Sequence, residues 1–369
     1  MNMKRTLHLI PLVISPYLLP AQLTVDNTMN PLELVQNMLL GPGITASNVL
    51  FNSASGTFVS EQAGSFNNGT SSLGWDQGVI LASGSIAVAN GPNTSGSFTL
   101  GGGNFGASDP DLEILSGYSM NDVARLEFDF IPTEDSVWLR FAFGSEEYPE
   151  YVCSAANDAF GIFLSGPGIT GPFENNAVNV AVVPGGNIPI SINTVNSGIP
   201  GGLNSASNCA QLDPDWEQNS AYYVDNTGST EIQLDGQTVA MTAVAAVISG
   251  SMYHLKLVIA DGGDTAFDSA VFIAANGFTS DLFSTINEPA SYDPQVRVDA
   301  LNGLLFFHDH MGSDAEVTIT DRIGRTVLRE RSLGQGVQPL NIAALSTGMY
   351  ILHLTGQNGA HMSSKFVIE

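Results

Sequence analysis

Residues Arg125-Leu-Glu-Phe-Asp-Phe-Ile131 contain the pattern that decides the fold, because their leucine and two phenylalanines alternate with Glu127 and Asp129. A period of two places successive side chains on opposite faces of a β-strand, so the apolar set predicts one buried face. Similar short runs, bounded by turn residues, recur along the chain. We predict further strands over 137–143, 159–164, 178–183, 189–195, 253–260 and 269–273.

The composition fits an all-β protein. The 369 residues include 39 glycines and 18 prolines, which favour many turns and few long helices. Only Pro31–Leu40 has apolar residues at helical spacing over a useful length, and 48–106 is rich in glycine, serine and asparagine. Hydrophobic residues make up 43% of the chain, enough for a substantial core. We predict a large β-sandwich of jelly-roll type.

The charge is strongly negative and unevenly distributed. Eleven basic residues face 36 acidic ones, giving a net charge of −25, which excludes nucleic-acid binding through a basic face. Between residues 22 and 294 there are three basic residues, Arg125, Arg140 and Lys256, against 29 acidic ones; residues 295–369 contain 6 and 7. This change predicts a sandwich domain over 22–283, a linker over 284–294 and a separate domain over 295–369.

The N-terminus has the features of a secretory signal peptide over residues 1–21. Lys4 and Arg5 precede a mostly apolar run, Leu7–Leu19, and Ala21 supplies a small residue before the expected cleavage site. A buried N-terminal helix is the alternative. The longest later apolar run, Val239–Ile248, has about half of the roughly 20 residues that a membrane-spanning helix needs, so we predict a buried strand there and no transmembrane segment after signal removal.

The last 75 residues predict a small Ig-like β-sandwich. Val317–Leu328 contains two alternating strands around the turn Asp321-Arg-Ile-Gly324, and further strands are expected over 340–345, 348–354 and 365–368. This hairpin, the segment Leu345-Ser-Thr-Gly-Met-Tyr350 and the terminal Lys365-Phe-Val-Ile368 resemble the C-terminal sorting domain of type IX secretion substrates of the Bacteroidetes. The resemblance implies recognition by the type IX secretion machinery, transport across the outer membrane, and removal of the tail with attachment of the protein to the cell surface. An ordinary Ig-like module is the alternative.

The large domain resembles the choice-of-anchor L family. The matching segments follow one another in order from residue 31 to residue 280. The resemblance implies a β-rich secreted or surface domain and no enzymatic activity. The segments are Leu34–Gly43, Gly74–Gly84, Leu126–Phe130, Gly144-Ser-Glu-Glu-Tyr-Pro-Glu-Tyr-Val-Cys153, Asn157–Gly161, Ser191–Asn196, Tyr253–Lys256 and Ile259-Ala-Asp-Gly-Gly-Asp-Thr-Ala-Phe-Asp-Ser269.

Two acidic clusters within these segments predict a metal site. Glycines 262 and 263 allow a sharp turn, so three carboxylates of the second cluster are expected to converge from one loop. Close carboxylates with few cations nearby raise one another's pKa or bind a cation, and Ca²⁺ accepts six to eight oxygen ligands. Solvated surface charge is the alternative. The predicted ligands are Glu146, Glu147 and Asp158 of the first cluster and Asp261, Asp264 and Asp268 of the second.

Two further acidic tracts, Asp109–Glu113 and Asp213–Glu217, lack the glycine and oxygen ligands of a calcium-binding EF-hand loop. We expect surface acids at both. Cys153 and Cys209 are the chain's only cysteines, and export to an oxidising compartment predicts a disulfide between them. Two buried free thiols are the alternative.

The catalytic patterns are weak. The sequence has no Gly-x-Ser-x-Gly motif, and His254 is the only histidine between residues 22 and 294. His308 and His310 form only a weak metal pattern. A secreted hydrolase of glycans or peptides, acting through Glu146, Glu147 and Asp158, is the alternative function. Sugar-cleaving clefts are usually lined with aromatic residues, and only three tryptophans are present. We predict a secreted, surface-attached, non-catalytic protein with an adhesive or structural role and an extracellular glycan or protein ligand.

Overall fold

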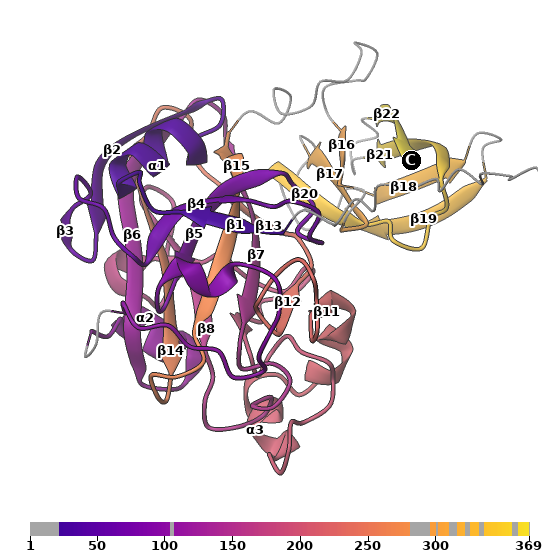
Figure 1. Ribbon diagram of the computed structural model, residues 1–369. Helices are drawn as coiled ribbons and strands as arrows, with labels where there is room; N and C mark the ends of the chain where they lie inside the picture. Colours follow the sequence, from indigo (N-terminus) through magenta and orange to yellow (C-terminus); the bar gives the residue numbers. More distant parts are fainter. Residues whose placement is uncertain are drawn as a thin grey trace, which may run out of the picture.

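A computed structural model describes residues 22–103, 107–280, 296–299, 302–309, 316–321, 325–331, 336–355 and 361–368. The predicted signal peptide and linker lie outside these residues and stay predictions. Within them the chain forms a large two-sheet β-sandwich and a smaller β-domain (Figure 1), so the predicted all-β class is confirmed.

The first sheet of the sandwich, called sheet A, has eight strands, and its paired strands run antiparallel. Strand β15, the last strand of the domain, lies between β5 and β7 in this sheet. Segments that are far apart in the sequence are therefore neighbours. Its order is β1 (Thr24–Asp26), β4 (Ala63–Asn67), β5 (Gln77–Ala82), β15 (Ser269–Thr279), β7 (Ser136–Ser145), β12 (Gly236–Thr238) and β11 (Tyr223–Asp225), with β13 (Met241–Ala246) also paired to β7.

The second sheet, sheet B, has seven strands and is also antiparallel. Its order is β10 (Ile190–Ser191), β8 (Ala159–Ser165), β14 (Tyr253–Gly262), β6 (Met120–Pro132), β2 (Ile44–Phe51) and β3 (Ala54–Ser55), with β9 (Val178–Asn179) also paired to β8. The chain crosses between the sheets from β6 to β7 to β8 and again from β14 to β15. Such crossing brings the ends of β7, β8, β14 and β15 together at one end of the sandwich.

Aromatic side chains from both sheets fill the space between them. Phe130 of β6 and Phe278 of β15 meet edge to face with ring centroids 4.9 Å apart, and Phe141 of β7 lies 5.4 Å from Phe160 of β8. On β6 the alternation predicted from sequence is confirmed, since Phe128 is buried and Glu127 is not. The outer face of sheet A is covered as well: a second apolar cluster, containing Phe272 and Leu234, lies there. Strand β7 therefore has buried side chains on both faces.

Several predicted elements have different bounds. The expected helix is α1 (Pro31–Leu34) continued by the π-helical turn Val35–Leu39, and Asn30 caps it through a hydrogen bond to the Glu33 N–H. The predicted strands over 178–183 and 189–195 shorten to β9 and β10, because Asn179 and Thr194 side chains bond nearby backbone groups. The run 239–248 forms the half-buried β13. Helices α2 (Pro110–Ser116) and α3 (Ala206–Leu212) were not predicted.

The tail consists of two small antiparallel sheets that share an apolar core including Leu305, Phe307, Ile319 and Leu352. Strands β18 and β19 form the predicted hairpin, although residues 322–324 of its turn lie outside the described part of the chain. One sheet is β16 (Val296–Asp299), β17 (Leu304–Asp309) and β20 (Gly336–Asn341); the other is β19 (Thr326–Arg331), β18 (Glu316–Asp321), β21 (Gly348–Thr355) and β22 (His361–Ile368).

Candidate functional site

Buried carboxyl groups gather at the end of the sandwich where β7, β8, β14 and β15 meet. Glu147 follows the end of β7 and Asp158 precedes β8, while Asp261 lies near the end of β14. The register explains their proximity, since Ala260 of β14 pairs with Ala159 of β8. All three carboxyl residues are at most 1% exposed. We call these three residues the carboxyl cluster.

The members of the carboxyl cluster differ in how well their oxygens are satisfied. Asp158 accepts hydrogen bonds from the Gly262 N–H at 2.9 Å and the Ser269 hydroxyl at 2.6 Å. Among the described residues, Oε1 of Glu147 and both carboxylate oxygens of Asp261 are buried without a hydrogen-bond partner. A buried oxygen without a donor is costly unless it carries a proton or binds a cation.

Burial raises the pKa of all three carboxyls well above their ordinary values, and mutual repulsion adds to it. The added charges on Glu147 are those of Asp261 and Asp264, and those on Asp158 are Glu147 and Asp264. On Asp261 the charge of Asp158 has the largest effect, and Asp268 and Asp122 add to it. The hydrogen bonds to Asp158 and the nearby Ser83 hydroxyl oppose the rise only in part. Burial and mutual repulsion therefore favour the protonated form of these carboxyls, and a bound cation would favour the ionised form.

The other predicted ligands from 261–268 do not converge as expected. Asp264 is exposed, and its carboxylate accepts the Ala266 N–H at 2.9 Å in a local turn. Asp268 is buried, but its carboxylate turns to the loop before α2, where it accepts the Leu100 N–H at 2.6 Å. Burial raises the pKa of Asp268 to about 6. The prediction of three convergent carboxylates was wrong, because the Asp268 carboxylate accepts a hydrogen bond from the Leu100 N–H and the Asp264 carboxylate accepts one in its own turn.

Glu146 belongs to a different group from its neighbour Glu147. It accepts hydrogen bonds from Gln233 at 3.2 Å and the Phe98 N–H at 3.3 Å. Burial and the charge of Asp235 raise the pKa of Glu146 to about 9, and burial raises that of Asp235 to about 6. Sequence reasoning missed Asp235, because no motif surrounds it. Glu146 and Asp235 form a carboxyl pair that can share a proton.

The carboxyl cluster is not a ready-made metal site. Among the described residues, no three His, Cys, Asp or Glu side chains form a group that could hold a metal ion as they stand. A bound ion would therefore use one or two of these carboxylates and complete its shell with carbonyl or water oxygens, which Ca²⁺ accepts in flexible geometry.

The predicted disulfide is present. Cys153 and Cys209 are bonded, with their Cα atoms 5.0 Å apart, and both are fully buried. The bond ties the loop between β7 and β8, which carries Glu147 and Asp158, to helix α3. Asn193 adds a second tie by accepting the Cys153 N–H at 2.7 Å. These bonds fix the segment from which two of the three cluster carboxylates project.

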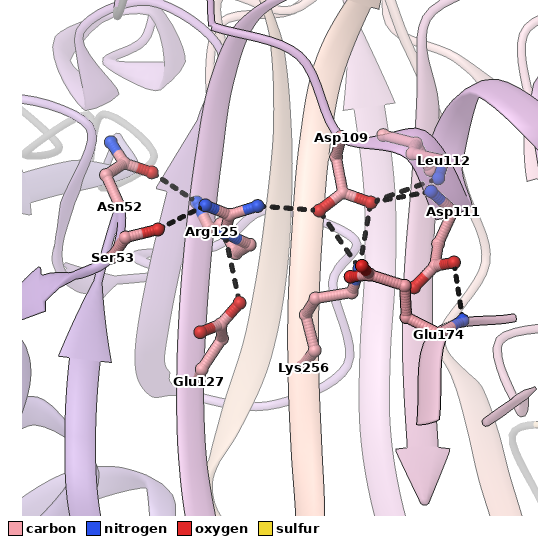
Figure 2. Close-up of polar contacts among 9 residues, drawn as sticks. All are labelled: Asn52, Ser53, Asp109, Asp111, Leu112, Arg125, Glu127, Glu174 and Lys256. Atoms are coloured by element: carbon pink, nitrogen blue, oxygen red, sulfur yellow. Dashed lines mark hydrogen bonds and ion pairs between the residues drawn. The ribbon is translucent and has the colours of Figure 1, made fainter. Parts of the chain in front are cut away.

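A second buried group contradicts the prediction of surface acids at 109–113. Asp109 and Asp111 are 0% and 2% exposed, and Lys256 of β14 bonds both, at 2.9 Å and 2.7 Å. Figure 2 shows this group, in which Arg125 of β6 adds a 3.0 Å bond to Asp109. Asp213 of the other tract is also buried and accepts from Asn219 at 2.8 Å.

The ion group anchors helix α2 to the outer face of sheet B. Asp109 is the helix cap and accepts the N–H groups of Asp111 and Leu112, while Asp111 accepts the Glu174 N–H at 2.8 Å. Burial alone would raise the pKa of Asp109, but Lys256, Arg125 and the Leu112 N–H hold it below its ordinary value. Arg125 and Lys256 of the ion group are two of the three basic residues between 22 and 294. Within the described residues, no basic side chain forms an ion pair with the carboxyl cluster.

His254 contacts a carboxylate on the neighbouring strand of sheet B. Its Nδ1 lies 2.9 Å from Oδ1 of Asp129 on the neighbouring strand β6, and Asn48 bonds the other oxygen of that carboxylate. In the tail, the side chain of His308 and all of His310 lie outside the described part of the structure.

Sequence comparison identifies both parts of the chain. The model of the choice-of-anchor L domain matches residues 24–279, more than half of the chain. The chain belongs to the choice-of-anchor L family. The secretion system C-terminal sorting domain matches residues 302–369, so this choice-of-anchor L protein carries a type IX sorting tail and is a secreted, cell-surface protein. None of the described helices is long and apolar enough to cross a membrane. Comparison with curated proteins gives no match.

Similarity to solved structures is weak. An immunoglobulin-like β-sandwich protein of the DUF3244 family from Bacteroides vulgatus is 24% identical, over 20% of this chain and 81% of its own, with a TM-score of 0.18. A Ruminococcus gnavus β-glucuronidase is 10% identical over 67% of this chain, and the BSP domain of a biofilm-associated protein is 9% identical over 69%, both with TM-scores of 0.18. The matches span 35% and 49% of those two chains. Scores this low carry no argument about function.

Proposed function

We propose that this choice-of-anchor L protein is a non-catalytic adhesive or structural component of the cell surface. The observation that carries the proposal is the joining of a choice-of-anchor L sandwich to a type IX sorting tail in one chain. The alternative, a hydrolase, would need Glu146, Glu147 and Asp158 to face a polymeric substrate. These side chains are at most 1% exposed, which favours a non-catalytic role.

Deleting residues 295–369 is expected to stop surface display and leave the protein in the periplasm, because the sorting tail is the part that the secretion machinery recognises. Surface labelling of intact cells, compared with immunoblots of periplasmic fractions, measures the effect. Replacing exposed Met349 of β21 by serine is a control that keeps the tail and should leave display unchanged. Normal display of the truncated protein would contradict the sorting role.

The adhesive role is tested on cells that lack the protein. These cells are expected to attach more weakly to one another or to a coated surface. The full-length gene should restore attachment, whereas the gene lacking 295–369 should not. Unchanged attachment of the deletion strain would contradict the adhesive role, and an unchanged cell envelope would contradict the structural role.

We further propose that the carboxyl cluster binds Ca²⁺. Support comes from Asp261, whose two oxygens are buried and have no partner at hydrogen-bond geometry although the Ser83 hydroxyl is nearby, and from the absence of a cation paired with the cluster among the described residues. A single proton can satisfy only part of such a group, whereas a divalent ion with water and carbonyl ligands can satisfy all of it. Asp261, Asp158 and Glu147 are the candidate carboxylate ligands of this proposal, of which an ion would use one or two.

Calcium is expected to stabilise the folded protein. With free Ca²⁺ at 100 times its dissociation constant, the stabilisation is about 2.7 kcal/mol relative to EDTA. The variant Asp261→Asn should lose most of this difference, while the exposed Asp215→Asn should keep it. Melting temperatures measured with Ca²⁺, Mg²⁺ and EDTA provide the test. Equal melting of wild-type protein in all three would rule out the site.

The pH dependence gives an independent check. In the unfolded chain the carboxyls titrate near ~4, whereas their pKa values in the folded protein are raised. Folding without metal therefore takes up protons. The stability that this proton uptake contributes is lost as pH rises from the carboxyl pKa of the unfolded chain toward the raised pKa of the folded protein. Bound Ca²⁺ removes those protons. The difference in melting temperature between Ca²⁺ and EDTA should thus widen as pH rises above the ordinary carboxyl pKa of about 4.

A further inference from the structure

Lys256 of β14 is held against two carboxyl groups on the outer face of sheet B (Figure 2). Its Nζ lies 2.7 Å from Oδ2 of Asp111 and 2.9 Å and 3.0 Å from the two oxygens of Asp109. The Phe163 ring centre lies 4.7 Å from the same nitrogen, and the Lys256 side chain is only 8% exposed. A primary amine and two carboxyl groups are thus in direct contact and largely shielded from water.

This contact favours a covalent reaction as well as an ion pair. An amine and a carboxyl group that are held together can condense to an amide and release water, because oriented groups react as if at concentrations of about 10⁵ M or more. Transfer of one proton from Lys256 to Asp111 turns the ion pair into a neutral amine and a neutral acid, which are the forms that react. Shielding from water favours the neutral forms and limits hydrolysis of the product.

Asp109 has the surroundings of a proton acceptor. Besides Lys256, its carboxylate accepts the Arg125 guanidinium at 3.0 Å and the N–H groups of Asp111 and Leu112 at 3.2 Å and 3.1 Å. Burial opposes ionisation of Asp109, but Lys256, Arg125 and the Leu112 N–H together hold its pKa below the ordinary value. Arg125 remains as a partner when Lys256 gives up its charge. Asp109 can therefore stay ionised beside the neutral amine and accept a proton from it.

Asp111 has the surroundings of the carboxyl group that is attacked. Its Oδ2 contacts Nζ of Lys256, and its Oδ1 accepts the Glu174 N–H at 2.8 Å. When a nitrogen adds to Cγ of Asp111, negative charge develops on Oδ1, and a backbone N–H already placed on that oxygen stabilises it. The two aspartates therefore differ in what they can do for the reaction.

We propose that Lys256 and Asp111 form an amide bond in the folded domain, with Asp109 as the proton carrier. The first ammonium proton moves to Oδ2 of Asp111, and the amine nitrogen then bonds to Cγ. The nitrogen passes its second proton to Asp109, which gives it to the Oδ2 hydroxyl. The Cγ–Oδ2 bond breaks, water leaves, and Asp109 is again a carboxylate. One ammonium and one carboxylate thus become one amide and one water, and the balance needs no oxidant, reductant or further reactant.

The amide bond ties helix α2 to strand β14 across a sequence separation of 145 residues. It goes beyond the adhesive or structural role proposed above and does not depend on bound Ca²⁺. Both reacting residues belong to the sandwich, so the bond stays with this domain in a protein without its tail. Removing Lys256 deletes the ion pair and the amide together, so the effect of that change on stability includes both.

Mass spectrometry of the purified full-length chain, reduced and denatured, tests the proposal. Wild-type protein is expected to be about 18 Da lighter than its sequence, because one water is lost. Digestion should yield a branched peptide that joins the segment containing Asp111 to the segment containing Lys256. Lys256→Arg keeps the positive charge but replaces the amine by a guanidinium that stays protonated, so this variant should have its full mass. Lys365→Arg, at an exposed lysine of β22, should keep the deficit.

Asp109→Asn tests the proton carrier. This variant keeps both reacting groups, and loss of a positioned acid–base group should slow amide formation about 100-fold or more. Chains purified from inclusion bodies under denaturing conditions start unlinked, and the fraction with the mass deficit is followed after refolding. Near-ultraviolet circular dichroism checks that each variant is folded. If Asp109→Asn does not fold, the branched peptide and Lys256→Arg still decide the proposal.

Three results would overturn the proposal: full mass in the wild-type protein, an equal deficit in Lys256→Arg, or a branch at Asp109 instead of Asp111. An equal rate of amide formation in Asp109→Asn would contradict the role of Asp109 as proton carrier. All of these results would leave the proposed function standing, because surface display and cell attachment are measured separately.

Discussion

Replacing Lys256 by methionine is expected to lower the free energy of unfolding of the sandwich by about 3–5 kcal/mol. Lys256 is the shared partner of Asp109 and Asp111, and all three side chains are buried. Methionine keeps much of the packing against the Phe163 ring, which lies 4.7 Å from the ammonium, but leaves Asp111 without a cation. Most of the loss therefore comes from unpaired buried charge.

Urea unfolding followed by tryptophan fluorescence measures this loss. All three tryptophans, at 75, 138 and 216, belong to the sandwich, so the signal reports on the sandwich and, through Trp138, on its contact with Phe306 of the tail. The matched control is Lys365→Met, which removes an exposed lysine of β22 and should change stability by no more than about 0.5 kcal/mol. The double variant Lys256→Met/Asp111→Asn should regain part of the loss. If Lys256→Met changed the free energy of unfolding as little as the control does, the ion group would add no net stability.

The ion group also predicts a pH response opposite to that of the carboxyl cluster. Because the pKa of Asp109 is lowered in the folded protein, its contribution is present above the unfolded value of ~3.9 and is lost only as pH falls through the folded value. Acid below about pH 4 therefore weakens the attachment of α2, while the carboxyl cluster without metal is weakened by rising pH.

Reducing the Cys153–Cys209 disulfide is expected to lower the free energy of unfolding by about 4 kcal/mol. The bond closes a loop across a sequence separation of 56 residues, and loop closure restricts the unfolded chain. Both cysteines are fully buried, so the reduced thiols should pack in nearly the same place. The double variant Cys153→Ser/Cys209→Ser should lose a similar amount.

The same urea measurement, with and without dithiothreitol, tests the disulfide. The double serine variant is the control, because its stability should not respond to reductant. The loop that carries Glu147 and Asp158 should also become more sensitive to limited proteolysis after reduction, with new cleavage between β7 and β8. Equal stability of oxidised and reduced wild-type protein would contradict the prediction.

Much of the fold could be predicted from the sequence because the patterns that indicate it lie in short continuous stretches. The alternation at 125–131 follows from the period of a strand, and the buried pattern of β6 confirms it. The family segments and the sorting tail are continuous stretches of sequence, and both comparisons confirm them. The disulfide followed from the presence of only two cysteines in an exported chain.

The site depended on tertiary structure. Glu146 and Glu147 are adjacent, yet one pairs with Asp235 and the other with Asp158 and Asp261, because neighbouring residues at a strand end point to opposite sides. Likewise, Asp109 looked like a surface acid until β14 placed Lys256 beside it, 147 residues along the chain. Sequence periodicity determines which residues form strands and which faces are apolar. Which charges meet and which donors stay unpaired depends on the order of the strands in the two sheets, and that order is set by long-range packing.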